Sequence, residues 1–244
     1  MNKKQRNPRR TKMTLERDFM NAIKAVIEED GFSKTTLAAI TEKAGIVPNV
    51  FYNRFKSLDD LFDEYIKKFD YWLVDVAGNI QPEAIKDHPV TFENILVALT
   101  ESLYTNKSMQ QILLWELAEE NKITSRSAKL REANTSGIVE SFDDFYKTVD
   151  PDIDIRVVSA LFIAGIYYLI LHKQRSTFCG VDFNKKEGRD LLIRNIRRLS
   201  KLIFHKKSAS NEIFRIAKNM KNKGFDAETI LEITGLSQEQ IQKL

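Results

Sequence analysis

The sequence predicts an all-α protein, with an N-terminal three-helix helix-turn-helix domain, a larger helical domain and a short helical C-terminal extension. Strand signals are scarce, and almost every apolar run repeats at spacings of three and four residues. Only 9 Gly and 5 Pro occur in 244 residues, so long helices are rarely interrupted. The length suits one or two domains. The predicted parts are an arm over 1–13, the helix-turn-helix domain over 14–57, the larger domain over 58–207 and the extension over 208–244.

Charge is distributed unevenly along the chain. The net charge is +4, but residues 1–57 carry 12 Lys/Arg against 6 Asp/Glu, a net charge of +6, which leaves −2 for the rest. Residues 1–13 hold six basic residues and no acidic one, a composition typical of a disordered arm. Such an arm could contact DNA phosphates or a minor groove, or could be only a solvated tail. The positive excess lies where binding to a polyanion would need it.

Composition also predicts what the chain lacks. The one cysteine, Cys179, cannot form an internal disulfide, which favours a reducing, cytoplasmic compartment. We expect no membrane association, because no apolar run is long enough to span a bilayer and no signal peptide is evident. Three scattered histidines and the absence of catalytic or metal-binding spacings predict no metal, no cofactor and no enzymatic activity.

The N-terminal domain is built on Thr14 to Asp30, the first predicted helix, which ends at Gly31. Thr35 and Thr36 are good N-caps for a second, short helix that ends at Ala44. Gly45 then suits a left-handed C′ position, and Pro48 suits the first position of a third helix. Two short helices joined by a glycine turn predict a helix-turn-helix, whose second helix enters the DNA major groove. A purely structural bundle of three packed helices is the alternative.

Residues from about 14 to 69 also resemble the DNA-binding domain of TetR/AcrR-type transcriptional regulators. The resemblance rests on Gly31-Phe32, Thr35-Thr36, Ile40, Ala44-Gly45-Ile46, Phe51-Tyr52, Phe55, Ser57 and Leu61. We expect Tyr52 and Lys56 to hold phosphates, and Thr36 to cap its helix against the DNA backbone. The side chains expected at base edges are those of Pro48, Asn49, Val50 and Asn53. Ala38, Val47 and Asn49 depart from the family's usual residues, so a base preference cannot be carried over.

The larger domain should begin with a connecting helix. Ser57 and Asp60 make a start signal, and the apolar stripe that follows predicts one helix from Leu58 to Val76. Such a helix is about 30 Å long and would link the two domains. The further helices are predicted over 91–106, 108–121, 124–149, 150–174 and 184–205. Asp150 and Pro151 mark the start of the most apolar of them, which should be buried on several sides.

The resemblance implies an assembly and a ligand. Helices 150–174 and 184–205 would pair with their symmetry mates in a four-helix bundle, giving a homodimer. Pockets between helices are mostly apolar with a few polar groups, and the middle helices are rich in aromatic residues. The candidate lining residues for an unknown small-molecule effector are Trp72, Phe92, Trp115, Phe142, Tyr146 and Tyr167, although each alone is more often a core residue.

The C-terminal extension, residues 208–244, is predicted to form three short helices over 211–223, 226–234 and 237–243. Gly224 and Gly235 end the first two helices, and Ser237 with Gln240 makes a capping box. The last two helices look like a second helix-turn-helix. Because basic and acidic residues balance there, packing on the dimer or binding another protein is favoured over a DNA role.

Together these observations predict a sequence-specific DNA-binding transcriptional regulator whose partner is a double-stranded operator. In this family such a protein is usually a repressor. A ligand that binds better to the conformation in which the two recognition helices have the wrong spacing would release the DNA. The alternative is a helical protein-interaction module in which the helix-turn-helix is only architectural.

Overall fold

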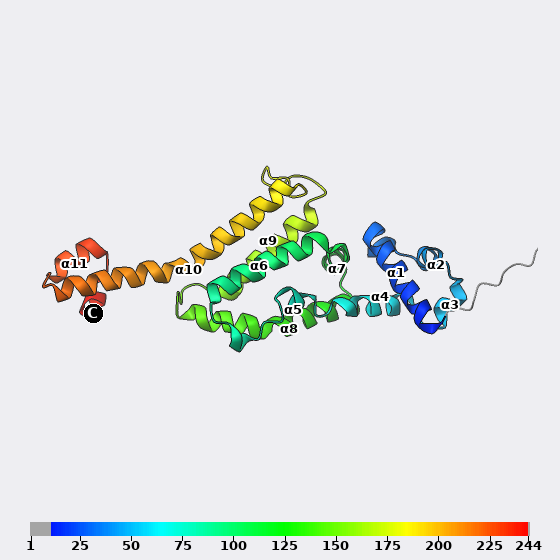
Figure 1. The fold of residues 1–244 in the computed structure, drawn as a ribbon, viewed down its shortest axis with the longest axis horizontal. Coiled ribbons are helices and arrows are strands. Elements are labelled where there is room, and N and C mark those ends of the chain that lie inside the picture. The colour runs from blue at the N-terminus through cyan, green and yellow to red at the C-terminus, as the bar shows by residue number, and fades with distance from the viewer. Residues whose placement is uncertain (1–10, 244) are drawn as a thin grey trace, which may run out of the picture.

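The fold is taken from a computed structural model, which describes residues 11–243, the side chains of 205–212 excepted. Within these residues every regular element is a helix, apart from one isolated bridge between Phe178 and Val181. The molecule is elongated, with α1–α4 at one end and α11 at the other (Figure 1). Most of the predicted arm, residues 1–10, lies outside the described part. Its last two residues, 12 and 13, belong to the first helix instead of the arm.

The N-terminal domain consists of α1 (Lys12–Asp30), a 3₁₀ turn η1 (Phe32–Lys34), α2 (Leu37–Ala44), α3 (Pro48–Tyr52) and α4 (Leu58–Ile66). Thr11 caps α1, and the predicted caps Thr36 and Ser57 both accept a hydrogen bond from the first turn of their helices. The helix-turn-helix elements were therefore predictable from local signals.

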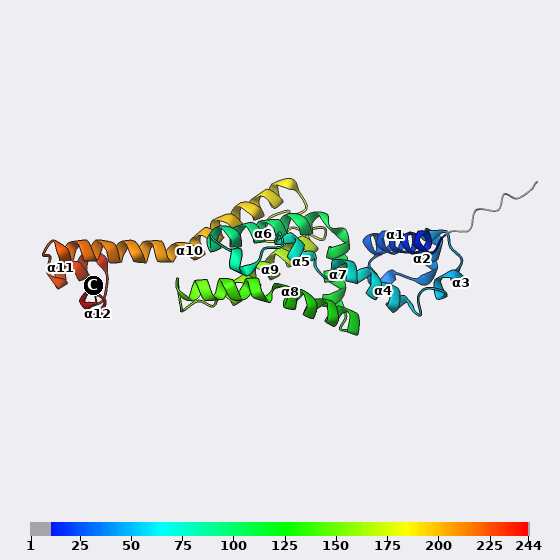
Figure 2. The same cartoon turned by 60° about the horizontal axis from the view of Figure 1, so that its bottom comes forward.

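The larger domain contains α6 (His88–Thr105), α7 (Lys107–Ala118), α8 (Lys122–Lys147), α9 (Ile155–His172) and α10 (Lys186–Asn222), with a short η3 (Pro82–Ala84) before α6. Helix α6 lies against α9 and α10, and α8 packs on α7 and α9. The two views of the ribbon show this bundle between the N-terminal domain and the end of α10 (Figures 1 and 2).

The prediction of one connecting helix from Leu58 to Val76 is wrong. This segment is divided into α4, a 3₁₀ turn η2 (Lys67–Phe69) and α5 (Trp72–Val76). At the break, Arg126 of α8 donates to the Asp70 carboxylate at 2.8 Å, and Asn134 Nδ2 donates to the Asp70 carbonyl at 3.2 Å. Because side chains of another helix satisfy Asp70, its carbonyl does not need a helical N–H four residues later.

Five predicted helix starts in the larger domain are displaced. The observed N-caps are Asp87, Asn106, Asn121, Asp154 and Lys185, in place of starts near 91, 108, 124, 150 and 184. Ser108 instead donates to Glu28 of α1, so it serves the contact between the domains. Asp150 and Pro151 form a turn, in which Ile153 N–H donates to the Asp150 carbonyl at 3.4 Å. Asp and Pro favour turns as well as helix starts, and at this position the chain forms a turn.

Helix α10 is longer than predicted. The helix expected to end near 205 and the first helix of the extension are one 37-residue helix, Lys186–Asn222. The extension ends in α11 (Ala227–Thr234) and α12 (Gln238–Gln242), which pack on each other and on the end of α10. Ala217, Ile230, Leu236 and Ile241 form the buried core of this unit, which is separate from the main core.

Helix α9 is more exposed than its composition predicts. Only Ile155, Ile166 and Ile170 are buried, whereas Val157, Leu161 and Tyr168 are 57%, 68% and 52% exposed. By length and composition alone, α9 is also apolar enough to span a membrane, which contradicts the expectation that no apolar run reaches that length. The helix is nevertheless one side of a packed bundle, because α6 and α8 cover its other side.

Candidate nucleic-acid interface

The turn between α2 and α3 depends on Gly45. Its φ of 60° and ψ of 44° lie in the left-handed region, and its N–H donates to the carbonyls at the end of α2. Glycine adopts this conformation without the steric penalty that a Cβ brings. Pro48 stands at the start of α3, where its missing N–H costs nothing. The chain therefore leaves α2 in the direction that places α3 across it.

An aromatic cluster holds α3 in place from below. Phe19 of α1 meets Phe51 and Phe55 edge to face, with ring centroids 5.8 Å and 5.7 Å apart. These three rings and Ile40 are at most 1% exposed. Edge-to-face pairs of this kind add stabilisation beyond their buried area. The outer side of α3 is thus presented on a rigid base.

All but one of the predicted DNA-contacting residues are exposed. Pro48, Asn49, Tyr52, Asn53 and Lys56 are exposed, and Tyr52 is 61% exposed although it is large and aromatic. Val50 is half-buried and contributes less of its surface to this side.

Thr36 lies at the N-terminus of the supporting helix α2. It is exposed and accepts the Ala39 N–H at 3.2 Å, as predicted for a cap. Val47, one of the unusual residues of the motif, is 64% exposed.

Basic side chains around the motif differ in their pairing. Lys43 contacts Glu29 at 3.1 Å, and Arg54 contacts Glu16 at 3.3 Å, so α1 carboxylates partly neutralise both cations. Within the described part of the chain, neither Lys34 nor Lys56 has an ion-pair partner. Exposed, unneutralised cations are the groups that displace counterions from a phosphate backbone.

An ion-pair network, which the sequence did not reveal, joins α4 to the larger domain. Arg126 of α8 donates to Asp63 at 3.0 Å and to Asp70 at 2.8 Å, while Lys67 contacts Asp63 at 2.8 Å. Burial alone would raise the pKa of Asp63, but the Lys67 hydrogen bond and the Arg126 charge lower it below its usual value. Asp70 is only 7% exposed and therefore depends on Arg126 for its partner. The link to α8 could not be read from spacing, because Arg126 is more than 50 residues from both Asp63 and Asp70.

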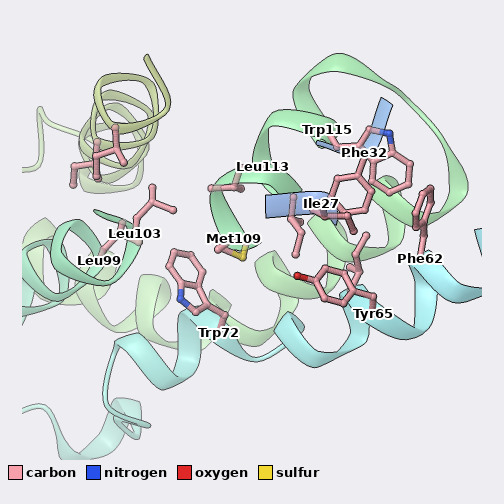
Figure 3. Packing of buried hydrophobic residues seen from close by; sticks show 14 of the residues in the cluster. Ile27, Phe32, Phe62, Tyr65, Trp72, Leu99, Leu103, Met109, Leu113 and Trp115 are labelled. Carbon is pink, nitrogen blue, oxygen red and sulfur yellow. The ribbon is translucent and has the colours of Figure 1, made fainter. Parts of the chain in front are cut away.

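A stack of aromatic rings makes the second contact between the domains. Phe32 of η1 lies parallel to Trp115 of α7, with centroids 4.3 Å apart, and Phe62 of α4 meets Trp115 edge to face at 5.6 Å. Figure 3 shows these rings together with Ile27 and Tyr65 at the junction. The N-terminal domain is therefore packed on α7 as well as tied to α8.

The predicted effector-pocket residues do not form one cavity. Phe92 and Phe142 line a small cavity of about 80 Å³ between α5, α6, α8 and α9. Trp115 and Tyr167 line an open groove of about 740 Å³ between η1, α7 and α9.

The remaining two predicted residues line neither of these spaces and take part in buried packing. Trp72 donates through Nε1 to Ser102 at 3.0 Å, and the Tyr146 hydroxyl donates to the Ile203 carbonyl at 2.9 Å.

A buried ion pair between α7 and α8 was also missed. Arg131, 7% exposed, donates to Glu116 at 2.6 Å, and burial raises the pKa of the neighbouring Tyr167 to about 12. The interruption of an apolar run by Glu116 was the only available sequence signal.

Comparisons with known proteins agree with this architecture. Residues 19–65 match the family model of bacterial regulatory proteins, tetR family, and residues 210–244 match the C-terminal HTH domain of the Rpn/YhgA-like nuclease family. The search of curated proteins gives no match.

Solved structures share the fold at low identity. The fatty acid degradation regulator FadR from Bacillus halodurans is 14% identical, with a TM-score of 0.53 over 81% of this chain and 96% of that one. Salmonella enterica GusR is 14% identical, with a TM-score of 0.54 over 81% and 99%. A TetR family transcription regulator from Marinobacter aquaeolei VT8 is 15% identical, with a TM-score of 0.53 over 75% and 94%.

The helix-turn-helix geometry, the family match over it and the shared fold lead to one identification. The chain carries the DNA-binding domain of the tetR family of bacterial regulatory proteins over residues 19–65, and as a whole it shares the fold of TetR-type transcriptional regulators.

Proposed function

We propose that the protein is a cytoplasmic, homodimeric repressor that binds a double-stranded operator and leaves it when a small molecule binds the larger domain. The observation that carries the DNA contact is the exposed outer side of α3, which rests on the buried Phe19–Phe51–Phe55 cluster. Tyr52 and Lys56 would contact phosphates, while Asn49 and Asn53 would reach base edges.

Dimerisation would use α9 and α10. Both helices carry large apolar residues that the single chain leaves exposed: Val157, Leu161, Tyr168, Leu191, Leu199 and Leu202. An exposed apolar surface of this kind is typical of a subunit interface. A second copy with the same surface would cover it by two-fold symmetry. The dimer would present two α3 helices to successive major grooves about 34 Å apart.

An uncharged, apolar part of the effector would occupy the apolar cavity between α5 and α8. The two polar residues in its wall, Thr135 and Ser159, donate their hydroxyls to the backbone of their own helices, at 2.9 Å and 2.7 Å. The wall therefore offers no strong donor to a ligand, and burial of apolar surface would supply the binding energy.

Release of DNA would follow from the connection between this cavity and α4. Leu73 of α5 and its C-cap Ala77 line the cavity, and α5 begins two residues after Asp70, which accepts a hydrogen bond from Arg126. A ligand that enlarges the cavity would shift α5 against α8, and α4 would carry the shift to the helix-turn-helix. The ligand needs only to bind the DNA-incompatible arrangement more tightly.

The test is selection of duplexes from fragments of the source genome by the full-length protein, followed by gel shifts. We expect one duplex to bind specifically. The double variant Asn49→Ala with Asn53→Ala should bind that duplex with an affinity lower by about 10–100-fold per lost base contact. Non-specific duplexes should bind as before, because the phosphate contacts remain. If no duplex binds even at low salt, the helix-turn-helix is architectural and the proposal is wrong.

A further inference from the structure

The C-terminal extension repeats the N-terminal helix-turn-helix in register. Helices α2 and α11 both have eight residues, and each ends at a left-handed glycine, Gly45 or Gly235. The buried residues also match in spacing: Ile40 and Ile230 precede their glycine by five positions, and Phe51 and Ile241 follow it by six. The unit formed by the end of α10, α11 and α12, residues 213–243, is called the C-terminal module below.

The charges of the two motifs are opposite in sign. Residues 34–53 carry Lys34, Lys43 and Glu42, a net charge of +1, and Arg54 and Lys56 follow. The equivalent residues 224–243 carry Asp226, Glu228, Glu232, Glu239 and Lys243, a net charge of −3. A net negative motif cannot neutralise phosphates as the N-terminal one can. The module therefore has helix-turn-helix geometry without the electrostatics of a DNA reader.

The missing positive charge lies on another part of the same module. Residues 213–223 of α10 carry Arg215, Lys218, Lys221 and Lys223 and no acidic residue. A basic segment and an acidic segment in one small unit make it complementary to a second copy of itself, because two-fold symmetry pairs each segment with its opposite.

The module also exposes apolar surface that its own chain does not cover. Ile216, Phe225, Leu231 and Ile233 are 41%, 48%, 40% and 62% exposed. Figures 1 and 2 show the module at the end of α10, remote from the N-terminal domain, and α11 packs mainly on α10 and α12. A unit of about 30 residues rarely buries enough surface to be stable alone, so association would compensate for a small core.

We propose that the C-terminal module is a self-association site, in which the acidic α11–α12 side of one copy binds the basic end of α10 of a second copy. The contact is separate from the α9–α10 pairing proposed above and does not depend on it.

The test uses the full-length protein in three steps, with mass measured by light scattering. First, Leu161→Glu with Leu199→Glu removes the α9–α10 contact, and we expect two copies to remain associated at low salt through the module. Second, adding Glu228→Lys with Glu232→Lys should give a single-chain mass. Third, adding Lys218→Glu and Lys223→Glu swaps the charges and should restore the dimer. Circular dichroism checks that each variant keeps its helix content.

Each contrary outcome has a distinct meaning. The proposal is overturned if the first variant is already monomeric at every concentration, or if the charge swap stays monomeric with native helix content. It is also overturned if Lys218→Glu with Lys223→Glu, added to Leu161→Glu with Leu199→Glu, lowers duplex affinity without changing mass, since the module would then bind nucleic acid instead of a second copy. If Glu228→Lys with Glu232→Lys alone gives monomers, the α9–α10 pairing has failed while the module contact stands.

Discussion

Tyr52 and Lys56 lie on the exposed side of the motif and supply the non-specific part of the proposed DNA contact. Replacing both with alanine should lower the affinity for every duplex about tenfold, since the charged hydrogen bond of Lys56 to a phosphate and the phosphate contact of Tyr52 are lost. The slope of log affinity against log salt should fall by about one, the contribution of one lysine. Gel shifts at several salt concentrations measure both quantities.

A matched control exists in the same chain. Tyr71 is 61% exposed, as Tyr52 is, and Lys68 is exposed nearby, but neither belongs to the helix-turn-helix. Tyr71→Ala with Lys68→Ala should leave affinity and salt slope unchanged. Equal losses from the two double variants would show that Tyr52 and Lys56 have no special role.

Arg126 is the residue that connects α4 and α8 electrostatically. Arg126→Gln should lower the free energy of unfolding by about 1–2 kcal/mol, because it leaves the buried Asp70 without its cation while Asp63 stays partly solvated. Lys24→Gln, which removes only a 3.9 Å pair between the exposed Lys24 and the half-buried Glu28, should cost less than about 0.5 kcal/mol. Urea unfolding of both variants makes the comparison.

The effect of Arg126→Gln should depend on pH. The pKa of Asp63 is lowered in the folded protein, despite burial that would raise it, by Lys67 and Arg126. A depressed carboxyl pKa stabilises the fold fully above the unfolded pKa, about 4, and this stabilisation is lost as the pH falls through the lower folded pKa. The difference between wild type and variant should therefore be constant near neutral pH and shrink below about pH 4. A difference that grows on acidification would contradict this explanation.

At the scale of the element, the turn after α2 sets the direction of α3. Gly45→Ala should cost about 1–2 kcal/mol, because φ is +60° and a Cβ is penalised there. Gly45→Asn should cost less, since asparagine tolerates the left-handed region. Thermal unfolding of the two variants and a gel shift on the selected duplex measure stability and function separately. Equal stability of both variants would mean that the turn relaxes without strain.

At the scale of the whole molecule, DNA affinity should depend on the dimer. Leu161→Glu with Leu199→Glu places charge on the α9–α10 surface, where both leucines are exposed in one chain. Even if the C-terminal modules keep two copies together, the two α3 helices would lose their fixed spacing. We expect operator affinity to fall by about 100-fold or more, the usual gain from two linked sites.

The control for this prediction is another exposed apolar residue. Val90 is 52% exposed at the start of α6 and lies off the α9–α10 surface, so Val90→Glu should change neither mass nor affinity. If the α9–α10 variant keeps full operator affinity, dimerisation does not use these helices. If it instead prevents binding to lipid vesicles that the wild type binds, α9 is a membrane contact.

The features that depend on near neighbours in the chain could be predicted from the sequence. The caps Thr36 and Ser57, the left-handed Gly45 and the position of Pro48 are local choices of backbone and side chain, so the helix-turn-helix was predictable. The second motif was predictable for the same reason, because Gly235 and the Ser237 capping box are also local. The family model over residues 19–65 confirms the first of these predictions.

Where helices break and which side chains meet depends on contacts between residues far apart in the chain, which the sequence does not reveal. Arg126 and Asn134 satisfy Asp70 from a distant helix, which divides the expected connector at that residue. The six predicted pocket residues have the same aromatic character, yet packing separates them into a cavity, a groove and two core positions. Aromatic character favours burial of a side chain, but the residues that it packs against depend on contacts between segments far apart in the chain.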